Sequence, residues 1–153
     1  SSSSQYEPHL NPYAASKHVI EHMEHTNICF MRFHTVYSEN TRKDMFFDKL
    51  LNGGLKYVTN HERDFIHVSD VCSAIKLIMS LDLKGSLDVG TGTSSKIHCM
   101  VRSLPLKISS RERKKTKANT KLLRSLGFKC TIDLETFLID NWDRITKANP
   151  GLF

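Results

Sequence analysis

Short apolar runs alternate along this chain with segments of helical periodicity, and this alternation constrains the fold more than any other feature. Apolar runs predict strands, whereas capped segments with apolar positions three or four residues apart predict helices. The predicted strands cover residues 27–33, 55–58, 65–68 and 86–89, and the predicted helices cover residues 12–25, 44–51, 69–80, 121–126 and 134–145. Residues 36–43 are predicted to form a polar loop, and Ser69 is predicted to cap the helix that it begins. Alternating strands and helices are typical of the α/β class.

The size of the chain suits one domain. It has 153 residues, 39% of them hydrophobic, which is enough for a buried core. No apolar run approaches the roughly 20 residues that a membrane helix needs, so we expect no membrane association. The four cysteines are spread along the chain without a C-x-x-C pair, which argues against a disulfide framework and a zinc ribbon. A reducing, cytoplasmic location is the simplest expectation.

A tyrosine and a lysine stand four residues apart at the start of the first predicted helix. Asn11 suits the N-cap and Pro12 the first turn. Residues at i and i+4 share a helical face, so Lys17 is expected beside the Tyr13 phenol. A free phenol titrates near ~10, and a neighbouring ammonium favours its ionised form. The pair is therefore a candidate general-base unit, although Tyr-x-x-x-Lys is also common by chance.

Several sequence blocks, in this order, resemble the extended short-chain dehydrogenase/reductase family, the NAD-dependent nucleotide-sugar epimerases and dehydratases. The resemblance covers Ser1 to about Trp142 and only what would be the C-terminal half of such an enzyme. Two stretches resemble a narrower subgroup, the UDP-glucuronate 4-epimerases. The family blocks are Ser1–Tyr6, Asn11–Lys17, Met31–Tyr37, Arg63–Val71 and Asp88–Gly92, and the subgroup stretches are Arg32–Tyr37 with Arg42–Met45, and Thr116–Asn119 with Leu126–Phe128 and Thr131–Leu134.

The resemblance implies the chemistry of the first block of candidate residues. Tyr13 would take the proton of a sugar hydroxyl while NAD removes a hydride. Lys17 would hold the nicotinamide ribose and tune Tyr13, and Phe33 is placed on the cofactor side. Ser2 stands where the family has a catalytic Ser or Thr, and it would hydrogen-bond the reacting oxygen. The alternative for Ser2 is a flexible polar terminus.

The resemblance also implies a substrate side, which we expect to receive a UDP-sugar. Arg63 matches an arginine that usually contacts the nucleotide diphosphate, and a guanidinium fork suits phosphate. Its alternative is a surface ion pair with Asp64 or Glu62. Thr35 matches a position that helps to hold substrate, and Arg111-Glu112 stands in place of a Gly-Asp pair near the nucleotide. His34 replaces a family aromatic, whereas Asp64 and Asp70 are expected to be structural, through caps and turns.

Three other patterns favour different functions more weakly. Residues His18 to His22 match H-x-x-E-H, a zinc-protease pattern. Because the chain contains eight histidines, such a match arises easily by chance, and we expect no metal. Residues 111–117 form a basic run that lacks interleaved aromatics for base stacking. The net charge of +6 equally suits phosphate-bearing sugar nucleotides, so we expect no nucleic acid. The sequence Gly90-Thr91-Gly92 lacks the third glycine of a dinucleotide fingerprint and is expected to lie on the substrate side.

These observations predict the C-terminal part of a Rossmann-type parallel sheet with a small α/β substrate-binding region. Residues 1–36 would be a remnant of the dinucleotide-binding sheet, and residues 37–153 mainly the substrate region. Because no glycine-rich turn offers an NAD pyrophosphate site, NAD binding by this chain alone is not expected, and the chain is interpreted as a fragment. Its loops are shorter than usual for the family, so the alternative is an inactive remnant that binds a sugar nucleotide or a partner. A homodimer is a further expectation.

Overall fold

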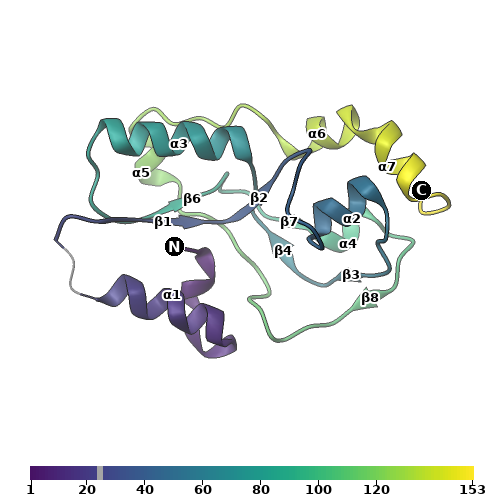
Figure 1. The fold of residues 1–153 in the computed structure, drawn as a ribbon, viewed down its shortest axis with the longest axis horizontal. Coiled ribbons are helices and arrows are strands. Elements are labelled where there is room, and N and C mark those ends of the chain that lie inside the picture. The colour runs from purple at the N-terminus through teal and green to yellow at the C-terminus, as the bar shows by residue number, and fades with distance from the viewer. Residues whose placement is uncertain (24–25) are drawn as a thin grey trace.

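The computed structural model describes residues 1–23 and 26–153 as an α/β fold, and Figure 1 shows its elements spread along one long axis. Two 3₁₀ turns, η1 and η2, precede α1. The helices are α1 (Pro12–His22), α2 (Phe46–Asn52), α3 (Val68–Ser80), α4 (Ile97–Met100), α5 (Lys121–Ser125), α6 (Leu134–Asp140) and α7 (Trp142–Ala148), and the turns are η1 (Ser3–Tyr6) and η2 (Pro8–Leu10). The strands are β1 (Cys29–Phe33), β2 (Thr35–Tyr37), β3 (Val58–Thr59), β4 (Glu62–Arg63), β5 (Phe65–His67), β6 (Gly85–Val89), β7 (Ser95–Lys96) and β8 (Leu106–Lys107).

Parallel pairing organises the strands. The strand β1 pairs with β6 from Cys29 opposite Gly85 to Phe33 opposite Val89. On the other side of β1, Ser2 forms a parallel bridge with Phe33. The pairs β2–β5 and β3–β8 are also parallel, whereas β4–β7 is antiparallel. The predicted α/β class with parallel strands is therefore confirmed.

Two hydrophobic cores meet at β5. Consecutive residues of a strand point to opposite faces, and Phe65 lies in one core while Ile66 lies in the other. The first core gathers the aromatic residues of β2, α2 and α6, and the second packs α3 and α5 against β1 and β6. This arrangement holds β5, and with it the Arg63–Asp64 segment, between the two halves of the molecule.

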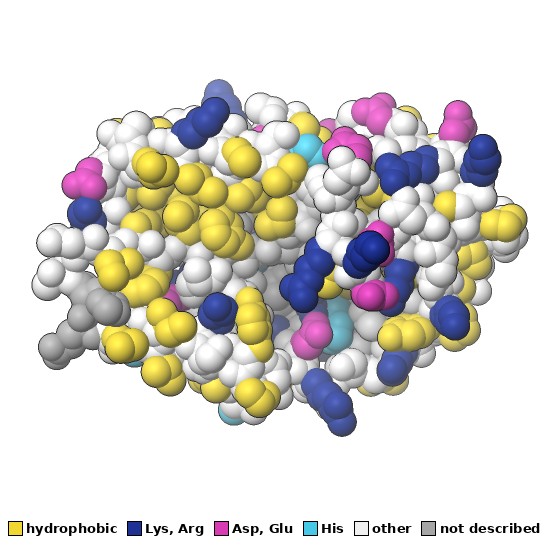
Figure 2. All heavy atoms as spheres, in the orientation of Figure 1, with side chains coloured by type: hydrophobic (Ala, Val, Ile, Leu, Met, Phe, Trp, Pro, Cys, Tyr) yellow, Lys and Arg dark blue, Asp and Glu magenta, His cyan; other side chains and the backbone are white. Residues whose placement is uncertain are grey.

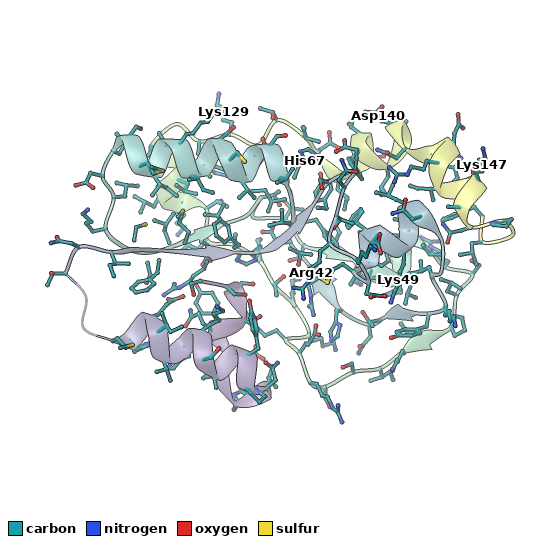
Figure 3. The ribbon with its side chains drawn as sticks, in the orientation of Figure 1. Arg42, Lys49, His67, Lys129, Asp140 and Lys147 are labelled. Atoms are coloured by element: carbon teal, nitrogen blue, oxygen red, sulfur yellow. The ribbon has the colours of Figure 1, made fainter. Side chains whose placement is uncertain are left out.

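Some predicted elements differ from the structure. Tyr37 was predicted to lie in a polar loop, but it is fully buried in β2, because the strand pairs with β5. The helix predicted over 134–145 is two helices, interrupted at Asn141, whose side-chain amide bonds the Phe137 carbonyl. The cap of α3 is His67 rather than Ser69, since the His67 ring accepts a hydrogen bond from the Ser69 amide. Figure 3 shows His67 at the junction of β5 and α3.

The boundaries of the remaining elements shift by a few residues. The strand predicted over 55–58 is β3, Val58–Thr59. The first helix ends at His22 rather than at residue 25, and the predicted positions 24 and 25 lie outside the described residues.

Hydrophobic side chains gather on one face of the molecule. Figure 2 shows them between α3 and β1. In α3 and next to β1, the exposed apolar residues include Val68, Met79 and Ile28. Helix α1 also exposes Val19 and Ile20, and Ala14 is its one buried apolar residue. Parallel sheets are normally covered on both faces, so this part of the sheet is less covered than is usual for its class.

Candidate active site

The start of α1 presents the Tyr13–Lys17 pair to solvent. The Asn11 side chain accepts a hydrogen bond from the Ala14 amide at 2.9 Å, and Pro12 occupies the first turn, as the sequence predicts. The Lys17 ammonium lies over the Tyr13 ring, 5.3 Å from its centre. The Tyr13 side chain is 55% exposed. The pair is thus on one helical face and open to a ligand.

Ser2 and Phe33 lie side by side at the edge of the parallel sheet. The bridge between them places Ser2 at the carboxyl end of β1, the end at which ligands bind in open α/β sheets. The Ser2 hydroxyl is shared with Ser4, accepting from its amide and donating to its hydroxyl, both at 3.3 Å. Ser2 is therefore ordered as the cap of η1 rather than a free polar terminus.

Thr35 and Arg63 lie near each other because β2 pairs with β5. Thr35 stands opposite Phe65, and its amide donates to the Asp64 carbonyl at 2.9 Å. The Arg63 side chain, in β4, is 11% exposed, and its Nη2 donates to Glu112 Oε2 at 2.8 Å. Its Nη1 donates to the carbonyls of Glu62 and Arg113 at 3.1 and 2.7 Å. The ion pair is formed with Glu112, not with Asp64 or Glu62. Burial lowers the pKa of Arg63, and Glu112 opposes that shift.

Residues 111–113 contact both the N-terminal segment that carries Tyr13 and Ser2 and the Arg63 side chain of β4. The Asn11 side chain donates to the Arg111 carbonyl at 2.9 Å. Arg113 donates to Glu7 and to the Ser3 carbonyl, at 3.1 and 3.2 Å. With Glu112 bound to Arg63, this short segment connects the start of α1, the N-terminal turns and β4. Part of the basic run is therefore neutralised within the chain.

The sequence did not predict a polar network that links the N-terminal turn and α1 to β1 and β6. Tyr6 donates to Asp88 Oδ1 at 2.7 Å and accepts from Arg32 Nη1 at 2.8 Å. Arg32 Nε in turn donates to Glu21 at 2.7 Å, and the Glu21 side chain is only 1% exposed. The network anchors α1 and the N-terminal turn to β1 and β6. Its one sequence signal is Arg32, a charge within an otherwise apolar strand.

Asp88 is the second acid of this network whose side chain is almost fully buried. Its other oxygen accepts from the Asn119 amide at 2.8 Å and lies 3.6 Å from His34 Nε2. Burial opposes ionisation, but the nearby His34 ring and the hydrogen bonds from Asn119 and Tyr6 outweigh it, so the pKa of Asp88 lies below its usual value. Burial, together with the hydrogen bond to Asp88, raises the pKa of Tyr6. Tyr6 is accordingly a poor proton acceptor and acts as an anchor.

Asp64 fixes the loop that follows β6. The side chain is fully buried and accepts from the amides of Thr91, Gly92 and Ala118 and from the Thr91 hydroxyl, at 2.7–2.9 Å. Asp70 likewise accepts from Thr131 and Ile132. Both acids are structural, as expected, but they act on distant loops rather than through local caps and turns.

The H-x-x-E-H pattern and the Gly90-Thr91-Gly92 sequence form neither a metal site nor a dinucleotide turn in the part of the chain that the structure describes. The rings of His18 and His22 stack 3.9 Å apart, and each Nδ1 contacts a backbone carbonyl. Within residues 1–23 and 26–153, no group of three or more His, Cys, Asp or Glu side chains could hold a metal ion. Gly92 is followed by the short β7 and α4 rather than by a long helix. Over the same residues, no helix is both long and apolar enough to cross a bilayer.

The parallel strand pairs and the helices packed against them define a Rossmann-like α/β protein. Residues 1–90 match the NAD dependent epimerase/dehydratase family. The match covers more than half of the chain, which therefore belongs to this family. The expectation drawn from the resemblance, including the NAD dependence of the family, is confirmed at this level. No curated protein matches the sequence.

Solved structures with a similar fold include several nucleotide-sugar enzymes. MoeE5 in complex with UDP-glucose and NAD is 26% identical, with a TM-score of 0.72, and the match covers 90% of this chain and 56% of MoeE5. The UDP-glucuronic acid 4-epimerase from Bacillus cereus, with UDP-glucuronic acid and NAD, is 22% identical, with a TM-score of 0.66 and coverage of 90% and 53%. The UDP-glucose 4-epimerase of Thermus thermophilus, with NAD, is 18% identical, with a TM-score of 0.71 and coverage of 90% and 55%. The chain spans about half the length of these proteins.

Proposed function

We propose that this chain is the catalytic and substrate-binding part of an NAD-dependent nucleotide-sugar 4-epimerase, most like a UDP-glucuronate 4-epimerase. It would act together with an N-terminal half that carries the NAD pyrophosphate site. Residues 1–36 would complete the dinucleotide-binding sheet, and residues 37–153 would mainly bind the substrate. The proposal rests on the family, on the neighbours that hold UDP-sugars and NAD, and above all on the Tyr13–Lys17 pair.

The pair supplies the acid–base chemistry. The Lys17 ammonium lies 5.3 Å from the Tyr13 ring centre, and Tyr13 would accept the proton of the sugar C4 hydroxyl. Bound NAD would supply the redox chemistry, by removing a hydride from C4 and returning it to the opposite face. Tyr13 then returns the proton to the C4 oxygen, so protons and electrons balance over the cycle. Ser2 hydrogen-bonds the same oxygen and steadies it during both transfers.

The described residues fit one end of NAD. Tyr13, Lys17 and Phe33 would hold the nicotinamide and its ribose, and the exposed Tyr13 face leaves room for them. The pyrophosphate needs backbone amides at a glycine-rich helix N-terminus, and the part of the chain that the structure describes offers no strand–glycine turn–helix of that kind. NAD affinity would therefore depend on the added N-terminal half.

The substrate would lie along the other candidate residues. Thr35 and Arg63 come from adjacent segments of the sheet, and the Arg63 guanidinium would contact the diphosphate of a UDP-sugar. Glu112, bound to Arg63 by an ion pair, would accept a hydrogen bond from a ribose hydroxyl. In this arrangement the diphosphate displaces part of the Arg63–Glu112 contact.

The same contact favours a second candidate function. Arg63 is already engaged by one carboxylate and two carbonyls, an arrangement that also suits a purely structural role. The alternative is thus an inactive remnant that binds a sugar nucleotide or a partner without catalysis. Catalysis by the completed enzyme distinguishes the two.

The test is a fusion of this chain behind the N-terminal half of the Bacillus cereus epimerase, assayed for conversion of UDP-glucuronate to UDP-galacturonate. The Tyr13→Phe variant should lose about 10²–10⁴ in rate while UDP-sugar binding stays nearly intact, because the phenol acts as charge develops on the sugar oxygen. Tyr57→Phe, at another exposed tyrosine, is the control and should remain active. Full activity of Tyr13→Phe would refute the assignment, and an inactive parent fusion that still binds UDP-sugar would favour the remnant.

A further inference from the structure

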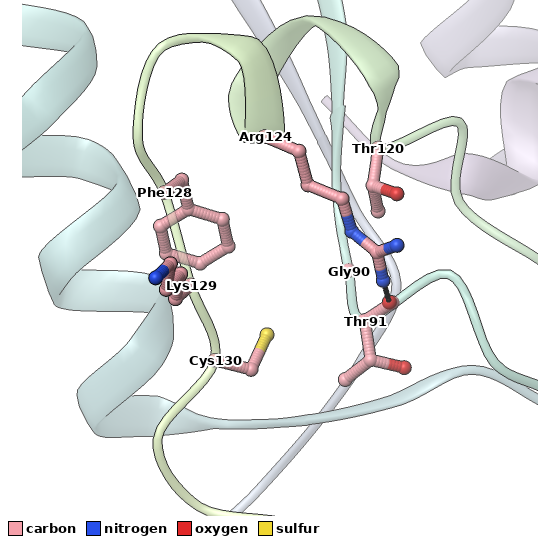
Figure 4. A pocket seen from close by; sticks show the side chains of 7 residues that line it. All are labelled: Gly90, Thr91, Thr120, Arg124, Phe128, Lys129 and Cys130. Atoms are coloured by element: carbon pink, nitrogen blue, oxygen red, sulfur yellow. Dashed lines mark hydrogen bonds between the residues drawn. The ribbon is translucent and has the colours of Figure 1, made fainter.

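A hollow of about 430 Å³ lies between α5 and the loop that follows β6. Its lining residues are Gly90, Thr91, Thr120, Arg124, Phe128, Lys129 and Cys130. Figure 4 shows the Arg124 guanidinium between Thr120 and Thr91, with the Phe128 ring and the Cys130 sulfur across from it. The volume is within the usual range of small-molecule sites, about 300–1,000 Å³.

One wall of the hollow is rigid. Asp64 holds the Thr91 and Gly92 amides, and Gly92 has a φ of +78°. A Cβ at Gly92 would lie 2.9 Å from Thr120 Oγ1 and 3.6 Å from Arg124 Nη2. The glycine thus lets the loop approach α5 closely. The loop carbonyl of Thr91 accepts from Arg124 Nη2 at 2.9 Å, which orients the guanidinium toward the hollow.

The charge of the lining is one-sided. Arg124 and Lys129 are cations, and the lining contains no carboxylate. The Asp64 carboxylate lies under the loop, but four donors already satisfy it. A guanidinium has five N–H donors in a planar fork, and the bond to Thr91 uses one of them. Lys129 adds charge from the outer edge of the molecule, beside α3 (Figure 3).

The opposite wall is apolar. Phe128 is buried, and its ring faces the hollow in Figure 4. Burial raises the pKa of Cys130 to about 11, so its thiol is neutral near pH 7 and does not repel an anion. An adjoining hollow of about 310 Å³ shares Thr91 and Cys130 but includes the Asp133 carboxylate. An anionic group is therefore favoured at the Arg124 end and disfavoured at the Asp133 end.

We propose that this hollow binds a small organic anion, in which a carboxylate or phosphate group pairs with Arg124 and a compact planar group lies against Phe128. A planar fork matches both kinds of oxyanion, and the aromatic wall selects for the organic part. The lining includes neither Tyr13 nor Arg63, and this proposal does not depend on the proposed epimerase chemistry.

The test is a titration of the ¹⁵N-labelled chain with phenyl phosphate, benzoate, inorganic phosphate and neutral benzamide, followed by amide chemical shifts. Phenyl phosphate or benzoate should cause saturable shifts at Thr91, Arg124 and Phe128, and the tighter of the two identifies the oxyanion. Benzamide and inorganic phosphate, which each lack half of the recognised chemistry, should bind at least roughly tenfold more weakly. Equal binding of inorganic phosphate would refute the aromatic contact, and no saturable shift in the millimolar range would overturn the site.

Variants of Arg124 and Lys121 distinguish binding in the hollow from nonspecific attraction of anions to a basic protein. Arg124→Met should weaken binding by roughly tenfold or more, whereas Lys121→Met, which removes a cation from the same helix but not from the lining, should leave it within twofold. If Arg124→Met does not fold, Arg124→Lys keeps the charge without the planar fork and should weaken binding several-fold. Unchanged binding in the folded Arg124 variant, or equal losses in Lys121→Met, would refute the assignment.

Discussion

Arg63 and Glu112, 49 residues apart in the sequence, form an ion pair of 2.8 Å that joins β4 to the segment before α5. The Arg63 end is nearly buried and the Glu112 end is largely exposed. The fold therefore holds the guanidinium, whereas its carboxylate partner is reached by solvent. A diphosphate that approaches Arg63 would compete with Glu112 and not with the two backbone carbonyls.

Replacement of Arg63 should weaken UDP-sugar binding. Loss of one charge-assisted phosphate contact costs on the order of 1.5–3 kcal/mol, which isothermal calorimetry would measure on the Arg63→Ala variant. Arg102→Ala, an exposed arginine elsewhere, serves as the control and should have little effect. Unchanged affinity in Arg63→Ala would remove Arg63 from the proposed substrate site.

Neutralisation of Glu112 should have the opposite effect. Glu112→Gln keeps the shape and a hydrogen-bonding oxygen but removes the charge that competes for Arg63. We therefore expect UDP-sugar affinity to rise a few-fold in the same calorimetric assay. A marked loss of affinity would show that the Glu112 charge itself binds the ligand.

Asp64 should be critical for folding. Its carboxylate accepts four hydrogen bonds in a fully buried position, and each buried donor left without a partner costs about 1–3 kcal/mol. Asp64→Ala should thus lower the free energy of unfolding by at least about 3 kcal/mol in urea titrations. Asp140→Ala, at the exposed end of α6 (Figure 3), should stay within about 0.5 kcal/mol. A small effect at Asp64 would contradict its role as the clamp of the loop.

Acid should weaken the fold through Asp88. The pKa of Asp88 is lowered in the folded state from 3.8, so its contribution is present above that value and is lost as the pH falls through the folded pKa. Urea titrations between pH 6 and pH 3 should show this loss, and Asp88→Asn should reduce the slope. Some slope will remain, because the pKa values of Asp48, Glu62 and Asp133 are also lowered. An unchanged slope in Asp88→Asn would contradict the prediction.

Local patterns were sufficient for the elements that form locally. The Asn11 cap and the Tyr13–Lys17 face need only residues within one helical turn, and the sequence predicted both. Tyr37 was misplaced because its burial depends on pairing with β5, nearly thirty positions away. A motif shows which residues are present, whereas burial depends on which distant strand lies beside them.

The candidate site shows the same division. The sequence proposed Arg63 and Glu112 separately, but it could not show that they bind each other, because 49 positions separate them along the chain. The hydrogen bonds of Asp64 and Asp88 could not be predicted either, because their donors, Thr91, Ala118 and Asn119, lie far from them in the sequence. Charges in apolar strands, such as Arg32, are the one local sign of such networks.

The last prediction concerns the link between α1 and the sheet. Glu21 lies in α1 and Arg32 in β1, and their side chains meet at 2.7 Å with Glu21 almost fully buried. Ser86 of β6 also donates to Glu21, at 3.3 Å. Removal of Glu21 or Arg32 leaves the charge of the other side chain without its ionic partner in a largely buried position. Each single alanine variant should therefore be clearly destabilised.

A double-mutant cycle isolates the pair. Urea titrations of Glu21→Ala, Arg32→Ala and the double variant should give a coupling energy of about 0.5–3 kcal/mol, since the double variant no longer contains an unpaired charge. The matching cycle on the exposed Asp82–Lys84 pair should give a value within the range of surface pairs, up to about 1 kcal/mol. If both cycles give the same small value, the Glu21–Arg32 contact does not hold α1 to the sheet. If the first is larger, the contact fixes the helix that carries Tyr13 and Lys17, and the geometry of that pair depends on it.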